Sequence, residues 1–273
     1  MLVRTVAGLI LAPIFLAVLV ALPVPVMVVM LSGIVMIASG ELLRATGAAS
    51  GHGCMYFFTA AAAGVVPFFH WLNIESVGLR MVSICLMVAL FLVAIFAYGR
   101  QKEVKAESIL FCLFGGLLIP TFMSSLLELR MLEHGRFLVL IPVVSSILTD
   151  VGAYFVGVLF GKHKGVTKVS PNKSAEGFAG GMLSGVVFMM AYGFVLHGGF
   201  DLPVNMLYMA IYGFVGSAVT MVGDLAFSLI KRQHGIKDYG RLIPGHGGML
   251  DRFDSLIFTA PTAYVLVSLL SAV

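Results

Sequence analysis

Charged residues are scarce in this chain. Asp, Glu, Lys and Arg make up 11% of its 273 residues, and apolar residues make up 60%. A soluble domain carries about 25% charged and about 45–50% apolar residues. So few charges cannot cover a surface that faces water, which excludes a water-soluble globular protein. We therefore expect an all-α fold, a polytopic transmembrane helical bundle with no separate soluble domain.

Cysteine is equally scarce. Cys54, Cys85 and Cys112 are isolated inside apolar runs without any C-x-x-C spacing, so the sequence supports neither a disulfide framework nor a zinc site. The net charge of +4 and the pI near 9.0 are compatible with a nucleic-acid binder. However, the Lys and Arg residues gather in short segments between apolar runs, which is typical of membrane proteins. No nucleic acid is expected as a partner.

Long apolar runs are what the chain does have. A membrane-spanning helix needs about 20 apolar residues. By this measure we predict about nine spanning helices, at residues 4–22, 24–40, 54–72, 79–98, 107–127, 136–160, 177–197, 203–230 and 254–272. The first two are separated only by Pro23-Val24-Pro25, so they form either a tight hairpin or one kinked segment. The first run resembles a signal peptide, but no cleavage site follows it, and we interpret it as a retained helix.

The basic residues predict how the chain is oriented in the membrane. With both termini on the same side, 13 of the 17 Lys and Arg residues fall on one side of the spans, and Arg4, Arg80, Arg130 and Arg136 fall on the other. Dividing the first spans differently would move Arg4 alone. The positive-inside rule places the rich side in the cytoplasm. We expect a multi-pass protein of a bacterial-type inner (cell) membrane, with the polar loops 161–176 and 231–254 in the cytoplasm and both termini outside.

Asp150 is the first of three polar features that stand out, because charges in membrane spans are costly. It lies within the apolar run 136–160. The residue either caps a broken helix or pairs with a neighbouring hydroxyl, or else it lines a polar cavity. The sequence leaves its role open.

The second feature is the segment 170–177, Ser-Pro-Asn-Lys-Ser-Ala-Glu-Gly. We predict that Ser174 is the N-cap of the following helix, with Glu176 in its first turn. A helix N-terminus beside Lys173 is also suited to bind an anion such as a phosphate.

The third feature runs from Asp224 to Asp254. On a helix, Asp224, Ser228 and Lys231 share one face, as do Asp251 and Asp254. Carboxylates next to several cations suit a complex of magnesium with a polyphosphate, since Mg²⁺ is usually held by one or two carboxylates plus substrate phosphates. A solvated basic loop would explain the lysines, but it would not explain why Asp224 lies inside an apolar run.

The third feature resembles a known family. Residues 228–254 follow the pattern S-x-x-K-R-x4-K-D-x-G-x3-P-x-H-G-G-x2-D-R-x-D, which is similar to that of the phosphatidate cytidylyltransferases (CDP-diacylglycerol synthases). Segments 150–154, 160–164 and 170–177 resemble the upstream blocks of that family, apart from Val151, where a small polar residue is expected. The resemblance covers residues 150–254, and the earlier helices resemble the family only in hydropathy and length.

The resemblance implies an enzyme that makes CDP-diacylglycerol and pyrophosphate from CTP and phosphatidic acid with Mg²⁺, a second cation being left open. It implies a catalytic region at 136–273 after N-terminal helices at 1–135, and a homodimer. It assigns catalysis to Asp224, Lys231 and Asp251, the two aspartates being the Mg²⁺ ligands. The expected substrate-binding residues are Lys173, Ser174, Glu176, Ser228, Arg232, Lys237, Asp238, His246, Gly247, Gly248, Arg252 and Asp254.

Two other functions fit a membrane protein with these features. A CTP-dependent polyprenol or lipid kinase would share the membrane setting and some of the acidic and basic blocks. A membrane transporter would explain many helices with charges in them, but it predicts charges near the middle of the membrane. Here the charges collect at one face.

Overall fold

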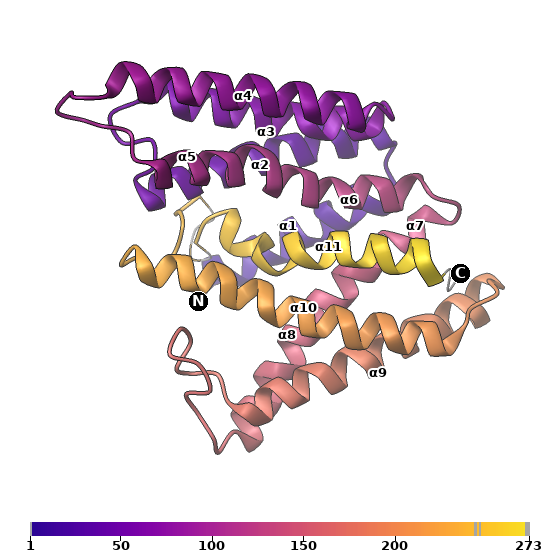
Figure 1. The fold of residues 1–273 in the computed structure, drawn as a ribbon. Coiled ribbons are helices and arrows are strands. Elements are labelled where there is room, and N and C mark those ends of the chain that lie inside the picture. Colours follow the sequence, from indigo (N-terminus) through magenta and orange to yellow (C-terminus); the bar gives the residue numbers. More distant parts are fainter. Residues whose placement is uncertain (1, 243–244, 246, 271–273) are drawn as a thin grey trace. The chain divides into compact units, whose positions relative to one another are not determined.

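The fold is built from helices. The computed structural model describes residues 2–242, 245 and 247–270, with side chains from Leu11 onward. Over these residues it contains no strand, only an isolated antiparallel bridge between Lys164 and Ser174. The helices are α1 (Leu2–Val20), α2 (Val24–Thr46), α3 (Gly53–Trp71), α4 (Glu75–Ala97), α5 (Ala106–Leu113), the π-helix η1 (Phe114–Leu118), α6 (Ile119–Met131), α7 (Gly135–Leu138), α8 (Leu140–Phe160), α9 (Ala175–Phe200), α10 (Met206–Gln233) and α11 (Leu250–Leu270) (Figure 1).

Eight helical segments of the described chain are long and apolar enough to cross a membrane. Their bounds are Val24–Thr46, Gly53–Trp71, Glu75–Ala97, Ala106–Met131, Gly135–Phe160, Ala175–Phe200, Met206–Gln233 and Leu250–Leu270. The predicted fold class, a polytopic transmembrane helical bundle, is confirmed, and the protein is a multi-pass integral membrane protein. The ninth predicted span, 4–22, corresponds to α1, of which Leu11–Val20 is a shorter apolar helix.

The break between the first two helices follows from the prolines. Pro23 has extended backbone (φ −60°, ψ 147°), and a second proline occupies the first turn of α2. Proline lacks an N–H group, so it is tolerated in a first turn and disfavoured further inside a helix. Nine crossings would leave the termini on opposite sides of the membrane. The expectation that both termini lie outside therefore requires an even number of crossings.

The chain forms two compact units. Unit 1 comprises Met1–Met131 and Gln233–Phe253, and unit 2 comprises Leu132–Arg232 and Asp254–Val273. Each is described by itself below. The resemblance predicts another division, into N-terminal helices at 1–135 and a catalytic region at 136–273. That division describes function and not packing, so it stays a prediction.

Unit 1 has its core between α2, α3, α4 and α5. The buried side chains at its centre include Leu43, Met55, Leu90 and Cys112. The outward face of α4 is apolar as well, and Ile84 and Phe96, for example, are 64% and 68% exposed. Such a face is suited to lipid rather than to water.

Unit 2 is built on close contacts between α8, α9 and α10. A side chain at Gly181 would meet the Thr149 carbonyl oxygen at 3.1 Å, and one at Gly213 would meet the backbone of Gly185 on α9 at 2.6 Å. Small residues every four positions let helix backbones approach closely in lipid. The recurrence of glycine at 177, 181 and 185 therefore serves helix packing.

Candidate functional site

An ion pair joins the second and third features of the sequence. The Lys173 ammonium contacts the Asp224 carboxylate, with 32% and 25% of the two side chains exposed. Lys173 lies one residue before the N-cap of α9, and Asp224 lies in the C-terminal half of α10. The Lys173 nitrogen also lies 5.7 Å from the centre of the Phe178 ring. Both partners belong to unit 2, so the contact is part of its packing.

Two more carboxylates of unit 2 interact electrostatically with this ion pair. Asp150 on α8 lies within electrostatic range of Asp224 and Lys173. Asp254 lies in the first turns of α11, within electrostatic range of Asp224, Lys231 and Asp150. We call these five residues the charge cluster. Its three carboxylates and two ammonium groups leave one negative charge in excess.

The role of Asp150 was open in the sequence, and its neighbours favour the polar interpretation. The residue is exposed at the surface of its helix. The charged residues that interact with it come from three other parts of unit 2. A helix cap or a pair with a single hydroxyl group would not account for these charged neighbours. These neighbours make Asp150 a candidate site residue that the sequence alone did not assign.

The start of α9 is as predicted. The Ser174 hydroxyl accepts a hydrogen bond from the Gly177 N–H at 3.1 Å, and Glu176 lies in the first turn. Glu176 is engaged by His163, whose backbone N–H donates to its carboxylate at 3.2 Å and whose ring nitrogen Nδ1 lies 2.5 Å from it. His163 was not among the predicted site residues. These contacts close the loop between α8 and α9.

The end of α10 carries the basic residues. Ser228 and Lys231 follow Asp224 on the same helix at the predicted spacing, and Ser228 is half-buried. The Arg232 guanidinium donates to the Val169 carbonyl oxygen at 3.4 Å. The loop 161–174 therefore lies beside the C-terminal end of α10, which brings the second and third features together within unit 2.

The glycine-rich segment belongs to unit 1. Asp251 is buried, and its Oδ2 accepts hydrogen bonds from the N–H groups of Tyr239 at 2.8 Å and Gly248 at 3.0 Å. Gly247 has φ +85°, a left-handed conformation that favours glycine. Asp251 thus holds the backbone of the segment that precedes α11.

The remaining predicted residues of this segment lie at its surface or outside the described chain. Lys237, Asp238 and Arg252 are exposed. His246 lies outside the described residues. Asp251 and Asp224 belong to different units, so their pairing as metal ligands stays a prediction.

The chemistry of the charge cluster fits a hydrated magnesium ion. Within the described residues no group of three or more His, Cys, Asp or Glu side chains is arranged to hold a metal ion by itself. Mg²⁺ does not require such a cage, since it keeps several waters and takes one or two carboxylates plus substrate phosphates. Mutually repelling carboxylates such as Asp150, Asp224 and Asp254 are stabilised by an added cation.

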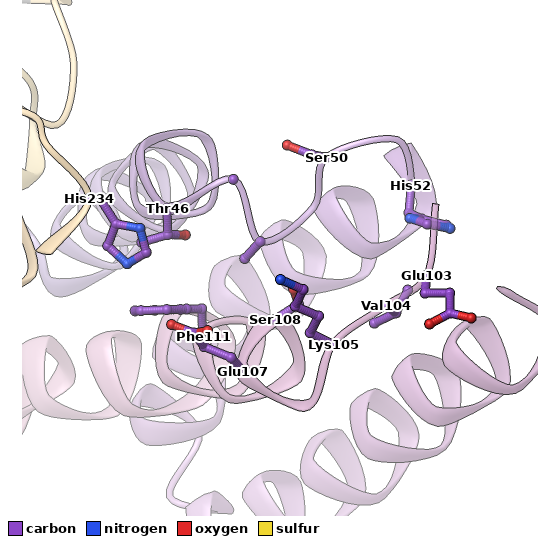
Figure 2. A pocket seen from close by; sticks show the side chains of 12 residues that line it. Thr46, Ser50, His52, Glu103, Val104, Lys105, Glu107, Ser108, Phe111 and His234 are labelled. Carbon is purple, nitrogen blue, oxygen red and sulfur yellow. The ribbon is translucent and has the colours of Figure 1, made fainter. Parts of the chain in front are cut away.

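A cavity of about 340 Å³ lies at one end of unit 1. Figure 2 shows His234 and Thr46 near one another in its wall, with His52 and Glu103 further along. The His234 ring lies edge-on to Phe111, with 5.3 Å between the ring centres. None of the predicted site residues lines this cavity. The cavity shows that segments 46–52 and 103–108 meet the segment after α10 at one end of unit 1.

Comparison with known proteins places these features in a family. Residues 2–270 match the Cytidylyltransferase family. The chain is 33% identical over 198 residues to a phosphatidate cytidylyltransferase of Bacillus subtilis, covering 72% of each chain. It is 38% identical over 161 residues to one of Mycobacterium bovis, covering 59% of this chain and 47% of that protein. It is also 44% identical over 120 residues to one of Staphylococcus epidermidis, covering 44% of this chain and 45% of that protein.

Proposed function

Because the chain belongs to the cytidylyltransferase family, we propose that this nucleotidyltransferase moves the cytidylyl group of CTP onto phosphatidic acid. Relatives of three genera bear the name phosphatidate cytidylyltransferase, which supports this choice of substrates. The structural observation that carries the proposal is the charge cluster. It joins residues from four separate parts of the sequence around the Lys173–Asp224 ion pair.

The reaction needs charge neutralisation more than proton transfer. A phosphate oxygen of phosphatidate attacks the α-phosphorus of CTP, a new P–O–P linkage forms, and the bond between the α-phosphorus and the bridging oxygen breaks to release pyrophosphate. The attacking phosphate is already ionised, so no strong base is required. Catalysis then depends on holding the reactants in line and on neutralising the charge that develops.

Lysines of the charge cluster would supply this neutralisation. We assign Lys231 to the reacting phosphates and Lys173 to the triphosphate or the lipid phosphate. Lys173 can exchange its contact with Asp224 for one with a phosphate, because the carboxylate and the phosphate are both anions. A quarter or more of the Lys173 and Asp224 side chains is exposed, so a phosphate can reach the lysine. Arg232 and Lys237 would bind further phosphate oxygens, and Gly247 would offer a backbone N–H group to an oxyanion. Gly248 would shape this turn beside the phosphates, since its own N–H donates to Asp251.

Magnesium is the proposed cofactor, with Asp224 as its ligand from the charge cluster. When bound, the ion would neutralise phosphate charge and fix the triphosphate in one conformation. Asp251 stays a predicted second ligand, although its Oδ2 already accepts two backbone hydrogen bonds. A homodimer also stays a prediction that rests on the family.

The membrane setting explains where the substrates enter. Phosphatidate lies in the bilayer, whereas CTP is soluble, so the site must lie at a membrane surface. The excess of Lys and Arg on one side of the spans supports the cytoplasmic surface of the cell membrane. The lipid would reach the site sideways between helices.

Labelled CTP tests the proposal. Purified protein is incubated with phosphatidate, Mg²⁺ and CTP that carries ³²P at either the α- or the γ-position. We expect the α-label in the lipid fraction and the γ-label in the aqueous phase. A lipid-bound γ-label would indicate a kinase, and label that enters neither lipid nor pyrophosphate would contradict the proposed function.

A further inference from the structure

A buried glutamate lies beneath the glycine-rich segment of unit 1. Glu41, in the last two turns of α2, is only 4% exposed, and its neighbours Leu42 and Leu43 are buried as well. A carboxylate at such a place costs free energy unless hydrogen bonds compensate for the lost water. Glu41 therefore needs hydrogen-bond donors that offset the free energy lost when its carboxylate leaves water.

The donor lies in the segment 239–250, described at 239–242, 245 and 247–250, which we call the glycine loop. The Glu41 carboxylate oxygen Oε2 accepts a hydrogen bond from the Leu250 N–H at 2.8 Å. Leu250 is the first residue of α11, and the first N–H groups of a helix have no partner within the helix. A negative charge at this end is also favoured by the helix dipole.

The glycines of the loop give an independent sign of the same contact. A Cβ atom added to Gly240 would fall on the Glu41 carboxylate, and so would one added to Gly248. The carboxylate therefore occupies space that any other residue type would fill at these two positions. The loop backbone closes around Glu41, while Asp251 binds the N–H groups of Tyr239 and Gly248.

We propose that Glu41 is a positioning residue, which holds the glycine loop in the shape that presents its residues to the phosphates of the substrate. The proposal rests on the proposed function, because the loop belongs to the pattern that carries it. Glu41 acts through the loop backbone and need not touch the substrate. It lies 209 positions before Leu250, so α2 of the N-terminal region takes part in building the site.

Two measurements on the full-length protein in lipid nanodiscs test this role. The first is the rate of trypsin cleavage after Lys237 and Arg241, two exposed basic residues at the loop, and it requires no activity. Glu41→Ala should speed this cleavage by about tenfold, because it removes an acceptor from a buried N–H and raises the population of the open loop. The second is the turnover of folded protein, for which Glu41→Ala should lower kcat/KM for CTP by about 10–100-fold through misplaced contacts.

Glu128→Ala is the matched control. Glu128 is a second poorly exposed carboxylate of unit 1, and it lies 2.9 Å from the His70 ring, remote in sequence from the loop. Its loss should leave the cleavage rate after Lys237 and the turnover per folded molecule unchanged. Wild-type cleavage and wild-type kcat/KM in Glu41→Ala would overturn the positioning role, and so would equal effects of Glu41→Ala and Glu128→Ala.

A second set of variants serves if Glu41→Ala does not fold. Gly248→Ala leaves Glu41 in place and forces the loop away from it, so it should speed cleavage and lower turnover in the same way. Glu41→Asp retracts the carboxylate by one methylene group, and the double variant should lose less activity than the product of the two single losses. Purely multiplicative losses would contradict the contact. Absence of cytidylyl transfer by the wild type would refute the proposed function alone, since the cleavage test stands without it.

Discussion

The Lys173–Asp224 ion pair offers a way to separate folding from catalysis. The two single variants Lys173→Met and Asp224→Asn each remove one charge and keep the size of the side chain. The double variant removes both. Their effects on stability and on turnover should differ in pattern. Each residue stabilises the protein through its contact with the other, whereas each charge acts on the substrate by itself.

The surroundings set the expected magnitudes. Exposed ion pairs contribute about 0–1 kcal/mol, and removing one partner of a buried pair costs about 3–5 kcal/mol. With 32% and 25% of the side chains exposed, Lys173→Met should fall between these limits, at about 1–3 kcal/mol. It leaves Asp150, Asp224 and Asp254 with Lys231 alone. Asp224→Asn should cost less, because Lys173 still lies within range of Asp150.

The double variant decides the matter. It should be more stable than Lys173→Met, since Asp224 is then neutral and no longer repels Asp150 and Asp254. Turnover should fall by about 10²-fold in each single variant, the scale of losing one preorganised electrostatic contact, and should not recover in the double variant. Stability is read from the midpoint of thermal unfolding in detergent, and turnover from transfer of α-labelled CTP into lipid. Recovered turnover in the double variant would refute a direct role of either charge.

Three further predictions follow from the charge distribution. Lys231→Met should keep the protein yield but lower kcat more than it raises the KM for CTP, and Lys231→Arg should rescue kcat in part. Lys168→Met on the exposed loop is the control and should behave as wild type. Equal kcat for Lys231→Met and wild type would remove Lys231 from catalysis. In a variant without native cysteines, an impermeant thiol reagent added to intact cells should label a cysteine at Asp201 and spare one at Gln233, and the opposite pattern would reverse the predicted orientation. Asp224→Asn should raise the Mg²⁺ concentration needed for half-maximal activity by at least about tenfold; an unchanged requirement would exclude Asp224 as a ligand.

Local features of the site were predictable because they depend on neighbours in the sequence. The N-cap at Ser174 follows from a hydroxyl residue just before a helical run with Glu176 in its first turn. The structure has the cap, with the Gly177 N–H as the donor. The common face of Asp224, Ser228 and Lys231 follows from helical periodicity alone. The same holds for close helix packing at glycines spaced four residues apart, such as Gly181.

Long-range contacts were not predictable in the same way. The sequence gives no sign that Glu41 contacts the loop near Leu250, because nothing local links an acid at the end of an apolar run to a segment far along the chain. Nor does it show that Asp150 lies near Lys173, since this depends on how α8 packs in unit 2. In both cases an acid beside or within an apolar run was the available signal, and only the fold supplies the partner.

The most direct test of the account is the stoichiometry of the products. Purified wild-type protein is given CTP, phosphatidate and Mg²⁺, and the CDP-diacylglycerol and pyrophosphate formed are quantified by mass spectrometry and by a pyrophosphate assay. The account predicts equal amounts of the two, no product without phosphatidate, and about 10²-fold less of both with Asp224→Asn. Pyrophosphate released without CDP-diacylglycerol, or full product formation by Asp224→Asn, would contradict it.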